Sequence, residues 1–237
     1  MKKKHISTLL ASTAAAFTLA AALSSCMGSV LHQTTDGDLT YTLRGSGDRV
    51  EQITVTRDGK RVATYQKRGL PAAECGENYG FRLTDLNFDR KGDMQLLILR
   101  EDGGDIYATY LWDEEKGEHV YSNALSSLRD MGMIASLEAI TAREFEITID
   151  PATDDTPDFE IRREAFVIYR WENGNLTPVH RKELTYYEES DIYCYLIQER
   201  NEQGEWDTVR ESWITADRFD SQKCPMDATG FEGYIPN

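Results

Sequence analysis

The sequence predicts a mainly β protein, with antiparallel hairpins in a propeller-like or sandwich-like arrangement and one short helical segment. Two observations predict this class. Short segments rich in Val, Ile, Thr, Tyr and Trp recur along the chain, and the turns between them contain Gly, Asn or Asp. β-branched and aromatic residues favour strands, whereas these turn residues favour tight reversals of the chain.

The first hairpin has the clearest signal. Residues 53–56 and 62–65 have strand composition, and Asp58-Gly59 stands between them. Asp-Gly is a favoured pair for a two-residue hairpin turn because both central residues need positive φ. We therefore expect two antiparallel strands joined by a tight turn.

Three later segments resemble one another and form a weak internal repeat. In each, an aromatic strand enters a Gly-containing polar turn and a second strand leaves it. Repeated hairpins of this kind favour a propeller-like or sandwich-like stack. The segments are residues 110–120, 169–179 and 193–209.

A helix is predicted only over residues 122–137. Leu125 and Leu128 lie on one helical stripe, and either Ser122 or Asn123 is a suitable N-cap. Gly132 is expected to interrupt the helix.

The first 25 residues have the layout of a secretory signal. Three lysines follow Met1, and residues 6–23 carry no charge. The run Leu23-Ser24-Ser25-Cys26 then resembles the lipobox of bacterial lipoproteins, in which the cysteine thiol receives diacylglycerol after small residues that admit the peptidase. We therefore expect lipidation of Cys26 and anchoring to a membrane. An uncleaved helix is the alternative, since a membrane span needs about 20 mainly apolar residues.

The predicted lipidation site divides the chain into three segments. Residues 1–25 are the lipoprotein signal peptide, residues 26–38 are a polar, aperiodic lipid-anchored tether, and residues 39–237 are a single β-rich domain. The expected location is the cell envelope, on an outer membrane facing the periplasm or on the cell surface.

The charge balance limits the partners. The formal net charge is −15, and removal of the lysine-bearing signal peptide makes the remaining chain more acidic. Such a surface disfavours nucleic acid and anionic lipid, and it favours cations or a basic partner.

Lipidation of Cys26 leaves an odd number of cysteines. Cys75, Cys194 and Cys224 allow one disulfide and one free thiol, and the sequence does not select the pair. There is no CxxC spacing, which argues against a zinc site.

One segment carries the pattern of a metal loop. Asp85, Asn87, Asp89 and Asp93 stand at relative positions 1, 3, 5 and 9, and the backbone carbonyl of Lys91 stands at position 7. Converging oxygens of this kind suit Ca²⁺, which takes about 6–8 oxygen ligands. The cofactor that this segment predicts is therefore Ca²⁺.

The same loop departs from an EF-hand at two positions. Arg90 stands where such loops place glycine, and Leu96 stands where they place a bidentate acid. The alternative is a turn whose carboxylates accept backbone N–H bonds without metal.

The runs DLNFDRKGDMQLLIL, IYATYLWDEEKGEHVYS and FVIYRWENGNLTPV resemble a group of bacterial envelope lipoproteins. In that group an Asp-Leu-Asn-Phe-Asp-Gly loop precedes an apolar strand, and Tyr-x-Trp hairpins follow; Arg90 stands in place of the glycine here. The loop is similar to the FG-GAP calcium loops of propellers. One branch consists of periplasmic immunity lipoproteins that inhibit lysozyme-like effectors. The resemblance implies a propeller-like fold with calcium and a basic, lysozyme-like envelope partner.

No catalytic motif is found in the sequence. Outside the signal peptide the histidines are scattered, and GxSxG, HExxH and P-loop patterns do not occur. The aromatic residues are expected mainly to pack across hairpins, with exposed members available to bind sugar or a partner protein. We therefore expect a non-enzymatic binding or inhibitory module. The alternatives are an envelope glycan hydrolase with an unrecognised carboxylate pair and a purely structural surface lipoprotein.

Overall fold

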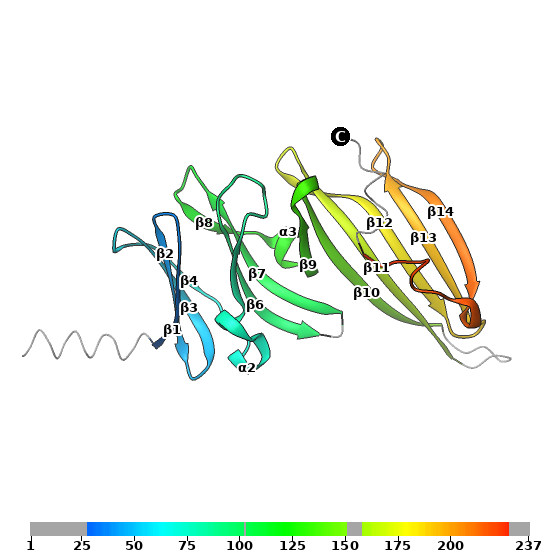
Figure 1. The fold of residues 1–237 in the computed structure, drawn as a ribbon, viewed down its shortest axis with the longest axis horizontal. Helices are drawn as coiled ribbons and strands as arrows, with labels where there is room; N and C mark the ends of the chain where they lie inside the picture. The colour runs from blue at the N-terminus through cyan, green and yellow to red at the C-terminus, as the bar shows by residue number, and fades with distance from the viewer. Residues whose placement is uncertain (1–27, 102, 151–157, 228–237) are drawn as a thin grey trace, which may run out of the picture.

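The structure is a computed structural model that describes residues 28–101, 103–150 and 158–227 (Figure 1). The expected signal peptide and the lipidation site Cys26 lie outside these residues. No helix in the described ranges has the length and apolar character that crossing a membrane would require.

The described strands form two antiparallel sheets, which confirms the mainly β class. The first sheet has the order β1-β2-β3-β4, and the second has the order β14-β13-β12-β11-β10-β9-β7-β6-β5, with β8 paired to β7. The first sheet contains β1 (Ser29–Asp36), β2 (Leu39–Ser46), β3 (Arg49–Arg57) and β4 (Lys60–Gln66). The second contains β5 (Phe81–Thr84), β6 (Asp93–Glu101), β7 (Gly104–Asp113), β8 (Glu118–Tyr121), β9 (Arg129–Ile134), β10 (Ala139–Asp150), β11 (Phe159–Glu172), β12 (Asn175–Tyr187), β13 (Ile192–Arg200) and β14 (Trp206–Thr215).

Helical segments are short throughout the described chain. The α-helices are α2 (Ala72–Cys75) and α3 (Asn123–Ser126). Single 3-10 turns occur at η1 (Glu77–Gly80), η2 (Ala135–Leu137) and η3 (Ala216–Arg218).

The expected hairpin turns are confirmed. Asp58 and Gly59 have φ of 50° and 72°, and Asn173 and Gly174 have φ of 52° and 78°. Two consecutive residues with positive φ define the turn type that matches the twist of the flanking strands. These pairs therefore set the reversals from β3 to β4 and from β11 to β12.

The two sheets pack against each other over one hydrophobic cluster, which fits the sandwich-like alternative. On β2, Tyr41 and Leu43 alternate with half-buried threonines and arginine, and both are fully buried. From the second sheet, Met94 and Leu96 of β6 meet them. The remaining buried members are Leu39, Val50, Ile53, Val55, Phe81, Ala108, Tyr110 and Trp112.

The repeated hairpins are neighbours in one continuous sheet. Strands β10 to β14 pair with one another in chain order, and Figure 1 shows them as a long sheet extending away from β1–β4. The described strands therefore do not form propeller blades around a channel.

The segment after β14 covers one face of this long sheet. Lys182 Nζ donates to the carbonyl oxygen of Asp227 at 3.0 Å, and Tyr195 Oη donates to that of Pro225 at 3.3 Å. Met226 packs on a cluster that contains Phe166. The opposite face carries ion pairs of Arg163 and Arg181 with Glu183.

The structure corrects the tether expected over residues 26–38. Ser29–Asp36 forms β1, which pairs with β2 along its length, and Leu31 packs on the core. The segment has no apolar alternation because neither of its faces is fully buried, and backbone pairing with β2 holds it in the sheet. The folded part therefore begins before Leu39.

The helix expected over residues 122–137 is correct only at its start. Ser122 caps α3, since its Oγ accepts from Leu125 N, and the chain then turns into β9. Gly132 is paired with Thr141 of β10, and a Cβ there would lie 2.6 Å from the Thr141 hydroxyl. Residues 129–134 therefore form strand β9 against β10 instead of continuing the helix, and the spacing of the leucines does not reveal this pairing.

No disulfide forms among the cysteines that the structure describes. Cys75, Cys194 and Cys224 are all free, and burial raises the pKa of each thiol.

Candidate functional site

The loop between β5 and β6 is a turn closed by its own polar side chains. Asp85 accepts from the backbone N–H groups of Asp89 and Arg90 at 3.0 and 2.9 Å. Asn87 Oδ1 accepts from Asp89 N, and Asp89 Oδ1 accepts from Lys91 N. Arg90 has φ of 69°, the positive value that glycine would adopt more easily. The side-chain hydrogen bonds therefore hold a strained turn in place.

Asp93 lies at the end of this loop and is fully buried. Its Oδ2 accepts from Leu86 N at 2.7 Å, and its Oδ1 accepts from Trp112 N at 2.8 Å. Burial raises the pKa of Asp93 to about 6; the two N–H bonds oppose the rise, and the charges of Asp89 and Asp85 add to it. The carboxylate clamps the loop to β7.

The predicted calcium ligands are therefore only partly brought together. Asp85, Asn87 and Asp89 share one turn, but Asp93 directs both oxygens to N–H groups of other segments. The predicted Lys91 ligand is its backbone carbonyl, and the Nζ of its side chain pairs with Oε2 of Glu114 at 3.8 Å. Among the residues described, no group of three or more His, Cys, Asp or Glu side chains has the arrangement of a metal site. The geometry fits the metal-free turn better, and calcium binding stays a prediction.

Gly92 joins this loop to the first sheet. A Cβ at Gly92 would lie 2.4 Å from Oδ2 of Asp36, at the end of β1. The carbonyl oxygen of Gly92 lies 2.9 Å from His119 Nε2, which makes this nitrogen the donor. The sequence gives no sign of this contact because the three residues are far apart along the chain.

His119 of β8 lies inside an aromatic cage between the sheets. Its ring makes edge contacts with Tyr41 of β2, Tyr65 of β4 and Trp112 of β7. Burial lowers the pKa of His119, although the Gly92 hydrogen bond and the charge of Asp36 favour protonation. Nδ1 has no hydrogen-bond partner in the described chain. The ring is therefore a packing group that is stable when neutral.

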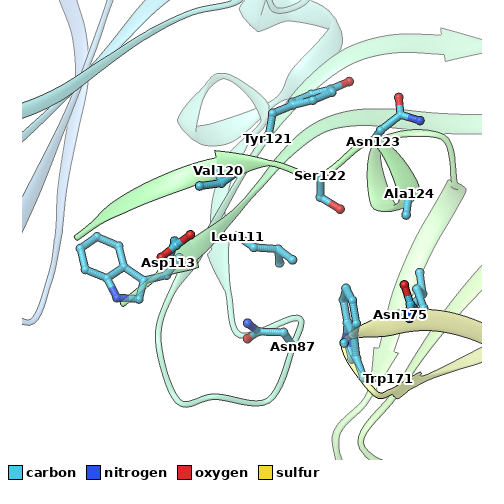
Figure 2. Close-up of a pocket in the computed structure, with 13 residues that line it drawn as sticks. Asn87, Leu111, Asp113, Val120, Tyr121, Ser122, Asn123, Ala124, Trp171 and Asn175 are labelled. Atoms are coloured by element: carbon cyan, nitrogen blue, oxygen red, sulfur yellow. The ribbon is translucent and has the colours of Figure 1, made fainter. Parts of the chain in front are cut away.

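A groove of about 420 Å³ opens beside the same loop (Figure 2). It lies between the β7–β8 hairpin, α3 and the β11–β12 turn. Figure 2 shows Asn87, Leu111, Ser122 and Trp171 around this hollow. Trp171 Nε1 donates to the carbonyl oxygen of Leu86 at 2.8 Å, which ties β11 to the loop. The sequence assigns these residues to a loop, two hairpins and the start of a helix, and no local pattern shows that they line one groove.

An exposed apolar row lies on the far part of β10. Phe145, Ile147 and Ile149 are 44%, 52% and 55% exposed. Alternate residues of a strand share one face, so the three side chains form one row. Their cross-strand partners on β11 are charged: Glu164, Arg162 and Glu160.

Comparisons with known proteins give no family. No family model matches the chain, and no curated protein matches it. A solved structure titled as a Xanthomonas type IV secretion system related protein is similar over 76% of this chain and 92% of that chain, with 15% identity and a TM-score of 0.46.

Proposed function

We propose that this chain is a lipid-anchored cell-envelope protein that acts as a non-catalytic binding or inhibitory module for another envelope protein. The observation that carries the proposal is the apolar row Phe145, Ile147 and Ile149. An alternation of apolar and polar residues normally marks a strand face that is buried. On β10 this face is about half exposed, as expected for a surface that a partner covers.

The surroundings of the row resemble the rim of a protein interface. Arg162 pairs with Glu160, and Arg143 pairs with Glu164. Apolar centres bordered by polar groups are typical of interfaces between proteins that also exist apart. The overall net charge of −15 favours a partner with a basic surface, such as a lysozyme-like protein.

The location is argued from the amino-terminal sequence. The lipobox-like run before Cys26 supports lipidation, and several acyl chains anchor a protein stably where one chain does so only marginally. We expect Cys26→Ser to release the protein from the membrane fraction. Retention of the variant in that fraction would favour an uncleaved helix.

The binding proposal is tested with the full chain, affinity-tagged and crosslinked in intact cells of its native host. We expect a specific basic envelope protein to be recovered with wild type and lost with Ile147→Lys. Val209→Lys, at an apolar residue of β14 that is 44% exposed, is the matched control and should retain the partner. If wild type recovers no specific protein, or if both variants retain it, the row is not the binding surface.

A further inference from the structure

We propose that the groove beside Trp171 binds a neutral carbohydrate chain, through the indole face and the amide side chains around it. This site is separate from the apolar row on β10 and adds a second ligand class to the proposed function.

The groove is preformed, because contacts between distant segments hold its walls. Trp171 is half-buried against a cluster of Leu86, Leu125, Met131 and Ile140, and the hydrogen bond to Leu86 fixes its indole. The volume of the groove, about 420 Å³, is in the range of small-molecule sites, about 300–1,000 Å³. A ligand would therefore bind without ordering this wall.

The polar groups of the groove are mostly neutral. Asn123 and Asn175 contribute amides and Ser122 contributes a hydroxyl, whereas the amide of Asn87, which also lines the groove, is already bonded to Asp89. An amide offers two donors and an acceptor, so it can bond hydroxyls that act as either. Ser122 Oγ accepts from Leu125 N, which leaves its O–H available to donate. Sugars present such hydroxyls along their edges and C–H groups on their faces.

The apolar surface of the groove suits the faces of sugar rings. Leu111, Val120 and Leu176 contribute aliphatic surface to the groove that Trp171 also lines, and Figure 2 labels Leu111 and Val120. An aromatic ring combines apolar area with a negative face that attracts C–H groups. The charged side chain in the lining is Asp113, which is paired with Lys116 and disfavours anionic ligands. Amides, an indole and no cation in the lining together favour a neutral glycan over a phosphate or an acidic peptide.

The test is a calorimetric titration of the full chain, in detergent, with each of two probes. The probes are a β-1,4-linked tetramer of N-acetylglucosamine and the corresponding glucose tetramer. We expect saturable binding of at least one, and comparison of the two shows whether the acetamido group is recognised. Trp171→Ala should weaken binding by about tenfold through loss of the ring contact. Asn175→Ala should weaken it by about fivefold through loss of a hydrogen bond.

The controls separate a binding role from a folding role. Trp213 of β14 is 58% exposed and does not line the groove, so Trp213→Ala should bind like wild type. Asn175 is exposed, which makes Asn175→Ala informative even if Trp171→Ala unfolds. Ile147→Lys should retain glycan binding, so failure of the partner test and failure of this proposal are distinguishable. No saturable binding of either tetramer by wild type, or equal weakening by Trp213→Ala, would overturn the proposal.

Discussion

Two regions of this protein use the same strand pattern with opposite results. On β2, the alternating residues Tyr41 and Leu43 are fully buried between the two sheets. On the far part of β10, the alternating residues Phe145 and Ile147 are 44% and 52% exposed. The difference shows that alternation identifies an apolar strand face. Whether that face is buried within this chain depends on whether another sheet packs against it.

The largest expected effect tests this comparison directly. Leu43→Ala removes buried methyl groups from the contact between the sheets and should cost about 2–5 kcal/mol of unfolding free energy. Ile147→Ala is the matched control and should change stability by about 0.5 kcal/mol or less in the isolated protein. Urea unfolding measures both. Equal losses would mean that the β10 row is packed within this chain.

The next effect concerns the carboxylate that clamps the loop. Asp93→Asn places an NH₂ group against one of the two N–H donors, Leu86 or Trp112, and should cost about 1–3 kcal/mol. Asp85→Asn makes the same change where water reaches the loop, so it should cost less. Thermal unfolding at pH 7 compares the two variants. A smaller loss in Asp93→Asn than in Asp85→Asn would show that burial of Asp93 does not matter.

The third effect is a pH dependence at the contact between the sheets. The pKa of His119 is lowered in the fold, so the unfolded chain binds more protons and stability falls as pH drops below about 6.5. The raised pKa of Asp93, about 6, acts in the opposite direction, because stability from this group increases as pH falls through 6 toward 4. Melting temperatures of wild type and His119→Gln at pH 7.5 and 5.5 separate the two groups. The melting temperature of wild type should fall more than that of His119→Gln between pH 7.5 and pH 5.5. An equal fall in both proteins would exclude His119 as the cause.

The smallest expected effect is that of calcium. The loop side chains already accept backbone N–H bonds, so the turn is closed without metal. We therefore expect a chelator to change the melting temperature of the protein little. Binding to the folded state alone would instead raise stability with calcium concentration. A rise of several degrees that Asp85→Ala with Asp89→Ala abolishes would establish the calcium site.

The local features were predictable and the distant contacts were not. Asp58-Gly59 and Asn173-Gly174 specify their turns through backbone preference, and Ser122, one of the two expected caps, caps a helix. Strand β1 could not be predicted from the sequence, because neither of its faces is fully buried and no apolar alternation results.

The helix over residues 122–137 was overextended because short apolar spacings fit helix and strand alike. The groove is a harder case. Its amides and Trp171 come together only through contacts such as the indole bond to Leu86, and no local pattern records them. The cage around His119 has the same origin.

The early start of β1 has a mechanical consequence. If Cys26 carries the proposed lipid, only Met27 and Gly28 separate it from β1, which begins at Ser29. Figure 1 shows β10–β14 on the side of the molecule away from β1. A partner bound to the β10 row would then be held away from the first sheet, with no long flexible linker between the lipid and the fold.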